Sequence, residues 1–244
     1  MSALPAPFRW EGDHMAADLP GGRVLFSSRR GGVSGGPYDS LNLGRLTEDD
    51  PANVDANRAR LAAAVGLPWE RILFGKQVHG ATVRRATGYD LPLAEEDGQA
   101  TALRDAAALV FVADCLPVLL ATDGAVAALH CGRRPLAAGI VAEGVAALRE
   151  LGAPGPITAA IGPGARGCCY EVSEEIQAEF AHIPGARTGE RNLDLPAIAR
   201  HQLAEAGVQT IHDTGICTIC DDRFFSHRRD GGVTGRQAGV VWRA

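Results

Sequence analysis

The sequence lacks several features that would each point to a particular class of protein. Its net charge is −5, so it lacks the basic excess expected of a general binder of nucleic acid or acidic membranes. Its first fifteen residues lack a basic segment followed by an apolar one, which predicts no signal peptide. The longest apolar stretch, AALVFVADCLPVLLA, is interrupted by Asp114 and Pro117 and predicts buried sheet rather than a membrane span. We therefore expect a cytoplasmic protein.

Motifs that define common enzyme classes are also missing. No GxxxxGK[ST] segment is present, and no GxGxxG follows a strand and opens a helix, which argues against the usual phosphate-binding loops. A serine hydrolase is poorly supported because no nucleophile elbow, in which a strand, a GxSxG turn and a helix follow one another, is predicted. Only two methionines, Met1 and Met15, are available as the axial ligand that a blue-copper site usually uses.

The chain does contain ample apolar material for a core. Hydrophobic residues make up 46% of its 244 residues and charged residues 22%, as in ordinary globular proteins. Apolar segments typical of strands lie at 21–28, 71–80, 108–122, 124–132, 156–164 and 238–242. Helices are predicted over 55–66, 136–151, 173–183 and 194–207, with Asp55, Ser173 and Asp194 as N-caps.

Strands and helices mix along the whole length, and no Pro/Ser-rich linker separates them. The pattern predicts one α/β domain over residues 1–244, with a mixed, buried sheet flanked by helices. No sustained heptad or apolar stripe is visible, so we expect a monomer.

Three reactive side chains stand at the ends of apolar strands, beside glycine or proline. They are His79 in KQVHG, Cys115 in ADCLP and His130 in ALHCG. Strand ends that face loops are the usual place for sites in α/β folds. Two imidazoles and a thiolate suit zinc and leave a fourth position for water or substrate. A buried cysteine or a single histidine more often has a structural role, and Cys115 with His130 could also form a nucleophile and its base.

Two similar arginine-glycine loops lie near the two ends of the chain. FSSRRGGVSGG spans residues 26–36, and FSHRRDGGVTG spans residues 225–235. Glycine-loop N–H groups and guanidinium groups suit phosphate or carboxylate, and Arg133 and Arg134 directly follow the strand of His130. We expect both loops to frame one anion-accepting site.

The remaining cysteines carry a weaker signal. Cys217 and Cys220 form one CxxC pair, but no second CxxC completes a structural zinc site. Cys168 and Cys169 are neighbours in GARGCCYEV, with no partner specified nearby. Without an export signal, we expect incidental thiols rather than disulfides at these positions.

Six motifs, in order, resemble those of the laccase-domain family. This family was long labelled multicopper polyphenol oxidoreductase and is now regarded as purine nucleoside phosphorylases. The motifs are FSSRRGGVSGGPYDSLNLG, KQVHG, ADCLPVLL, ALHCG, IGPGARGCCYEV and FFSHRRDGGVTGR, and they spread over most of the chain.

The resemblance implies a zinc-dependent enzyme that phosphorolyses adenosine, inosine and methylthioadenosine and also deaminates adenosine. It places the metal ligands and catalytic centre on His79, Cys115 and His130. It implies that Arg29 and Asn42 line the pocket, and Arg134 and Arg228 are our further candidates for holding phosphate. The implied fold is the α/β type of bacterial toxin deamidases that use a cysteine and a histidine.

One motif departs from the family pattern. The family usually has His-Ala-Gly-Trp-Arg-Gly after the third ligand strand, whereas this chain has His-Cys-Gly-Arg-Arg-Pro, with Arg133 and Pro135 in place of the tryptophan and last glycine. Three alternatives stay open: a copper-dependent polyphenol oxidase, as the old family label says, a metal-free cysteine hydrolase or deamidase, and a nucleoside-binding protein in which the altered loop has abolished turnover.

Overall fold

A computed structural model describes the fold of residues 4–89 and 93–243. Its strands are β1 (Arg9–Glu11), β2 (His14–Leu19), β3 (Gly22–Phe26), β4 (Ile72–Leu73), β5 (Val83–Ala86), β6 (Gly98–Thr101), β7 (Ala107–Val112), β8 (Leu116–Thr122), β9 (Ala125–Cys131), β10 (Thr158–Ile161), β11 (Arg187–Thr188), β12 (Asn192–Leu193), β13 (Thr210–Asp213) and β14 (Gln237–Trp242). Its α-helices are α1 (Pro51–Val65), α2 (Arg133–Ala137), α3 (Ile140–Glu150), α4 (Glu174–Glu179) and α5 (Leu195–Glu205).

The strands form two large mixed sheets and one small hairpin. The first sheet has the order β1-β2-β3-β14-β7-β4, and only its β4–β7 pair is parallel. The second has the order β13-β10-β8-β9-β6-β5, with β10–β13 and β5–β6 parallel. The mixed α/β character expected from the sequence is confirmed, but the expected single sheet is wrong. Apolar strands in sequence do not reveal which of them pair, so one sheet could not be told from two.

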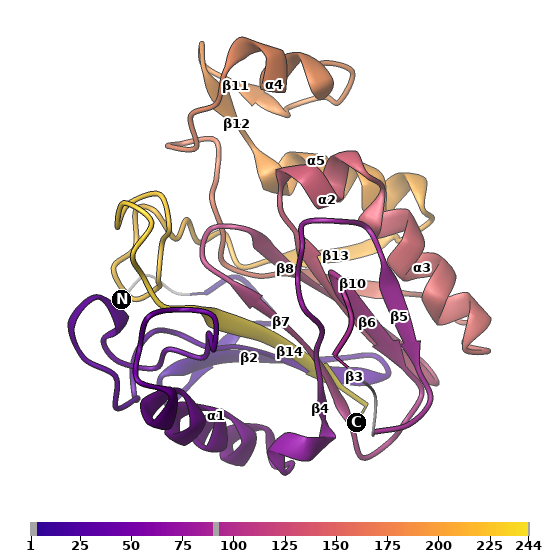
Figure 1. Ribbon diagram of the computed structural model, residues 1–244. Coiled ribbons are helices and arrows are strands. Elements are labelled where there is room, and N and C mark those ends of the chain that lie inside the picture. Colours follow the sequence, from indigo (N-terminus) through magenta and orange to yellow (C-terminus); the bar gives the residue numbers. More distant parts are fainter. Residues whose placement is uncertain (1–3, 90–92, 244) are drawn as a thin grey trace.

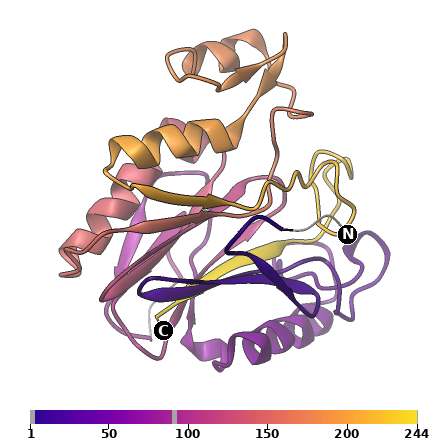
Figure 2. The same cartoon turned by 180° about the vertical axis from the view of Figure 1, so that it is seen from behind.

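The two sheets pack face to face and form the centre of the molecule (Figure 1). Val24, Phe26 and Val110 of the first sheet share a buried apolar cluster with Leu119 and Val126 of the second. Helix α1 covers the outer face of the first sheet, while α3 and α5 cover that of the second (Figures 1 and 2). The segment with α4, β11 and β12 projects beyond this layered core (Figure 2).

Three of the expected helices differ from the sequence expectation. The helix expected over 173–183 ends at Glu179, and Ser173 precedes it without a capping hydrogen bond from its side chain. Helix α1 begins at Pro51, one turn before the expected Asp55, because Asp50 caps it by accepting a 2.9 Å hydrogen bond from Ala52 N. The expected helix over 136–151 is interrupted at Gly139, whose φ of 87° is left-handed and separates α2 from α3. The expected cap of α5 is confirmed, since Asp194 accepts a hydrogen bond from Ala197 N.

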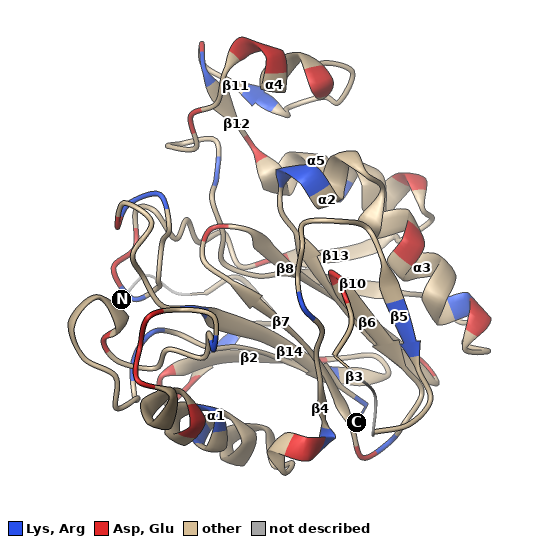
Figure 3. Ribbon diagram, viewed as in Figure 1, with Lys and Arg blue, Asp and Glu red and all other residues tan. Residues whose placement is uncertain are grey.

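Charged residues of both signs are distributed over the helices and loops (Figure 3). None of the helices formed by residues 4–89 and 93–243 combines the length and apolar character needed to span a bilayer.

Candidate functional site

Three separate chain segments bring His79, Cys115 and His130 together. Strands β8 and β9 are antiparallel, and their register pairs Leu116 with Cys131 and Pro117 with His130. Cys115, just before β8, therefore lies beside the end of β9. His79 arrives from the loop that follows β4. The ligand-type atoms of the three residues lie within 4.8 Å of one another, so the expected convergence is present in the structure.

The geometry of this group is compatible with a tetrahedral metal ion. Cys115 Sγ lies 3.9 Å from His79 Nε2, and the two imidazole centroids are 4.8 Å apart at an interplanar angle of 71°. Metal bonds of about 2.3 Å to sulfur and about 2.0 Å to nitrogen would give a sulfur–nitrogen separation of about 3.5 Å. His130 is buried, Cys115 half-buried and His79 exposed, so the group opens to solvent on one side.

Asp97 organises two of the three residues, and sequence reasoning missed it. Its fully buried carboxylate lies 2.7 Å from His130 Nδ1, which leaves Nε2 of that ring free to face the group. It also accepts backbone hydrogen bonds from Val78, His79 and Gly80, at 3.1, 3.0 and 2.7 Å. A carboxylate that orients a histidine ligand from behind is a common feature of metal sites. No local pattern marked Asp97, because its partners lie 17 to 33 residues away.

The electrostatics of the group favour a thiolate. Burial raises the pKa of Cys115, but attraction and hydrogen bonding to His130 and His79 outweigh this and lower it to about 6. Burial lowers the pKa of His130, yet the Cys115 thiolate and Asp97 raise it overall, to about 9. The pKa of Asp97 is raised by burial and lowered more by the hydrogen bonds from His130 and the backbone, with a net lowering. A thiolate is the form of cysteine that binds metals and attacks electrophiles.

The backbone around the group is specialised. His79 and Asp114 have φ values of 62° and 88°, which are uncommon for residues other than glycine and concentrate at functional sites. A Cβ atom at Gly132 would lie 2.6 Å from Cys115 Sγ, so any larger residue at this position would displace the sulfur. Asp114 accepts hydrogen bonds of 2.7 Å from Thr218 Oγ1 and from Arg228 N, which ties the Cys115 turn to the second arginine-glycine loop.

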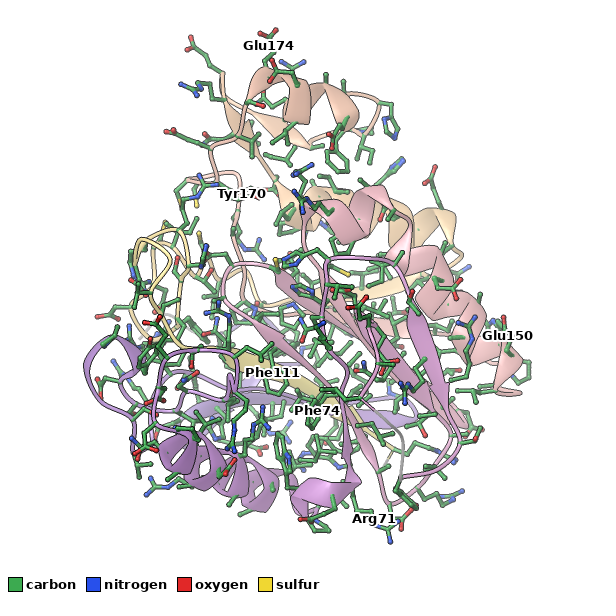
Figure 4. All side chains as sticks on the ribbon, in the orientation of Figure 1. Arg71, Phe74, Phe111, Glu150, Tyr170 and Glu174 are labelled. Atoms are coloured by element: carbon green, nitrogen blue, oxygen red, sulfur yellow. The ribbon has the colours of Figure 1, made fainter. Side chains whose placement is uncertain are left out.

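The group stands in the wall of a cleft with a volume of about 890 Å³. Such a volume is within the range of pockets for small molecules and exceeds that of a nucleoside. The walls include aromatic side chains, three of which are labelled in Figure 4: Phe74, Phe111 and Tyr170. Phe74 and Phe111 lie over the first sheet, and Tyr170 lies toward the projecting α4 segment (Figure 4).

Polar groups of the cleft include several arginines and the unpaired amide of Gln99. Arg228 and Arg236 line it, and burial lowers the pKa of Arg236. Arg58 lies between Phe74 and Phe111, with its guanidinium about 5 Å from both rings, and burial lowers its pKa to about 10. Gln99 is only 1% exposed, and neither its oxygen nor its nitrogen has a hydrogen-bond partner.

The two arginine-glycine loops lie side by side, but they do not contribute equally. The first follows β3 and the second precedes β14, and these strands are antiparallel neighbours. Arg29 N donates to Arg223 O at 2.9 Å, and the Arg29 guanidinium lies 4.7 Å from the Phe225 ring centroid. Of the described residues that line the cleft, His227 and Arg228 come from the second loop and none comes from the first.

Two other expected substrate-binding residues are likewise outside the cleft lining. Arg134 is exposed on α2. Asn42 is fully buried, and its amide donates to Thr47 Oγ1 and Asp49 and accepts from the N–H groups of Gly44 and Arg236. These bonds occupy the side chain entirely and position the backbone at Arg236, which does line the cleft.

The chain matches the family model described as multi-copper polyphenol oxidoreductase laccase over residues 23–244. The chain belongs to this family. Within it, a relative from Corynebacterium glutamicum named purine nucleoside phosphorylase is 44% identical over 236 residues, which cover 90% of this chain and 94% of the relative. A relative from Streptomyces griseus with the same enzyme name is 43% identical over 241 residues, covering 94% and 98%.

A solved structure shares the fold described above. The crystal structure of YlmD from Geobacillus stearothermophilus superposes with a TM-score of 0.89 at 33% sequence identity, covering 98% of this chain and 99% of that protein. The relatives support an enzyme of the purine nucleoside phosphorylase kind, and the His-Cys-His group supplies a possible metal site.

Proposed function

We propose that this chain is a zinc-dependent purine nucleoside phosphorylase that acts on adenosine, inosine and methylthioadenosine and also deaminates adenosine. The observation that carries the proposal is the convergence of His79, Cys115 and His130 in the wall of a cleft that is large enough for a nucleoside. The names of the relatives from Corynebacterium and Streptomyces supply the reaction class.

The donor set favours zinc over copper. Two imidazoles and a thiolate, one imidazole backed by Asp97, match an open zinc site. A blue-copper site would also use an axial methionine. Met15 is fully buried in the core between the sheets, and Met1 lies outside the described residues. When bound, zinc would supply Lewis acidity at its open coordination position.

The residues of the cleft fit the demands of phosphorolysis. In that reaction a phosphate oxygen forms a bond to the anomeric carbon while the C–N bond to the purine breaks, and the electron pair of that bond stays with the base. The anionic phosphate needs fixed positive charge, which Arg228 and Arg236 supply from the cleft wall. Arg236 is held by hydrogen bonds of 2.8 and 2.9 Å from its guanidinium to Thr234 O and Gly235 O.

The other face of the cleft suits the purine. Phe74 and Phe111 offer apolar ring surfaces on which a planar base could stack, while Tyr170 lies on the wall of Arg228, whose guanidinium is 5.1 Å from its ring centroid. The unpaired amide of Gln99 offers both a donor and an acceptor, the combination found on the edge of a purine. Burying an amide without a partner is costly, so a ligand that pairs with it gains affinity.

Product analysis tests the proposal. The zinc-loaded protein is incubated with adenosine, inosine or methylthioadenosine, with and without phosphate, and the products are separated by chromatography. We expect free base and the sugar 1-phosphate only when phosphate is present, and ammonia from adenosine. His79→Gln should abolish both activities, whereas His182→Gln, which changes an exposed histidine outside the cleft lining, should leave them intact. Base release that is independent of phosphate, or binding without any product, would refute the phosphorylase.

A second candidate function rests on the same residues. Cys115, with a pKa of about 6, His130 and Asp97 also form the nucleophile, base and orienting carboxylate of a metal-free cysteine hydrolase or deamidase. This reading would agree with the implied kinship to toxin deamidases. Activity that survives complete zinc removal and is lost on thiol alkylation would favour it over the phosphorylase.

A further inference from the structure

Four cysteines that the sequence treats as two unrelated pairs form one cluster in the structure. Cys168 and Cys169 lie in the loop after β10, and Cys217 and Cys220 lie in the turn after β13. Their four Sγ atoms are all within 4.8 Å of one another. The sequence specified no partner for either pair, whereas the structure makes each pair the neighbour of the other, and all four remain free thiols as expected.

The sheet topology explains this convergence. Strands β10 and β13 are parallel neighbours whose register ends at the pair Ile161 and Asp213. The chain leaves both strands at the same edge of the second sheet, and the isolated bridge between Gly164 and Cys217 prolongs the pairing into the loops. Because 48 residues separate Cys169 from Cys217 in sequence, the pattern of a single CxxC could not reveal the second half of the cluster.

The sulfur positions suit one tetrahedral ion. Cys169 Sγ lies 3.0 Å from Cys220 Sγ, 3.2 Å from Cys168 Sγ and 3.3 Å from Cys217 Sγ, while Cys168 and Cys220 are 3.7 Å apart. Four bonds of about 2.3 Å to a central zinc ion give sulfur–sulfur edges of about 3.8 Å. Each of the four separations is well above the length of a disulfide bond, about 2.05 Å.

We propose that Cys168, Cys169, Cys217 and Cys220 bind one zinc ion in a closed tetrathiolate site, distinct from the His79, Cys115 and His130 group. All four positions of a tetrahedral ion would be taken by sulfur, so this ion would have no open position and its role would be structural.

The location of the cluster indicates what the ion would stabilise. Tyr170, which lines the cleft, directly follows Cys169. The CxxC turn is bonded to the second arginine-glycine loop, since the Arg229 guanidinium donates to Thr218 O at 2.7 Å and to Asp221 O at 3.2 Å. An ion bound by all four cysteines would join the Cys168–Cys169 loop to the CxxC turn. It would thereby stabilise the wall of the cleft that carries Tyr170 and Arg228.

Metal stoichiometry of the full-length protein tests the proposal without reference to nucleosides. Protein purified under reducing conditions with added zinc is measured by elemental analysis and native mass spectrometry. We expect two zinc ions per chain in the unaltered protein, one in Cys115→Ala, and one in Cys217→Ser or Cys220→Ser. Cys131→Ala changes the single cysteine that belongs to neither group and should retain two.

The coordination sphere is tested in the Cys115→Ala protein, in which the remaining zinc should occupy the cluster. X-ray absorption at the zinc edge should show only sulfur neighbours, at about 2.3 Å. This measurement leaves the cluster unaltered and therefore does not depend on whether its serine variants fold. Three outcomes would overturn the proposal. The Cys115→Ala protein could contain no metal, or its zinc could have nitrogen or oxygen neighbours. The protein could also show unreactive thiols and a mass lower by two hydrogen atoms per cysteine pair. The last result would identify disulfides.

Discussion

Replacement of Asp97 by asparagine tests whether this carboxylate positions His79 and His130 for metal binding. Oδ1 accepts from His79 N and lies 2.7 Å from His130 Nδ1, while Oδ2 accepts from Val78 N and Gly80 N. Asparagine has one oxygen, and its NH₂ group cannot accept. Whichever way the amide is turned, two of these four hydrogen bonds are lost.

The magnitude follows from this count. Leaving a buried donor unpaired costs about 1–3 kcal/mol, so Asp97→Asn should lower the free energy of unfolding by at least about 2 kcal/mol. Loss of a carboxylate behind a ligating histidine weakens metal binding about 10- to 100-fold, or about 1.4–2.7 kcal/mol. Both effects should appear together, because the same carboxylate holds the His79 backbone and the His130 ring.

Zinc affinity is measured by competition with a chromophoric chelator, and stability by urea unfolding of the zinc-free protein. Asp123→Asn is the matched control, since Asp123 is exposed in the turn between β8 and β9 and should change the stability by less than about 0.5 kcal/mol. An Asp97→Asn protein that is less stable but binds zinc as tightly as the unaltered chain would refute the positioning role. Asp97 would then serve the fold alone.

Two further substitutions test the cleft. Gly132→Ala places a Cβ atom 2.6 Å from Cys115 Sγ, and overpacking of about 1–3 kcal/mol should reduce zinc affinity by about 5- to 150-fold. Gly88→Ala is the control, because a Cβ atom there meets no atom within 4 Å and zinc affinity should not change. If Gly132→Ala binds zinc as tightly as the unaltered protein in the chelator competition, the steric argument is wrong. Gln99→Leu removes an unpaired buried amide, so thermal unfolding should show undiminished stability while KM for inosine rises about fivefold, the value of one hydrogen bond. Thr122→Val, which removes another unpaired buried group away from the cleft lining, should leave KM unchanged; an unchanged KM in Gln99→Leu would show that the amide does not contact the nucleoside.

Local sequence determined much of the secondary structure and the residue types of the candidate site. The cap of α5 at Asp194 and the left-handed end of α1 at Gly66 depend on groups a few residues away, so both were predictable. His79, Cys115 and His130 could be selected because reactive side chains at the ends of apolar strands are visible in one dimension.

Tertiary structure decided which distant groups meet. The pairing of β8 with β9 and of β10 with β13 sets Cys115 beside His130 and joins the four-cysteine cluster. Asp97 and Gln99 have ordinary sequence surroundings, and their importance comes from burial and from partners, or the lack of one, that only packing defines. Hydrogen bonds and metal coordination act over a few ångströms, and the sequence shows which residues are that close only when they are near neighbours along the chain.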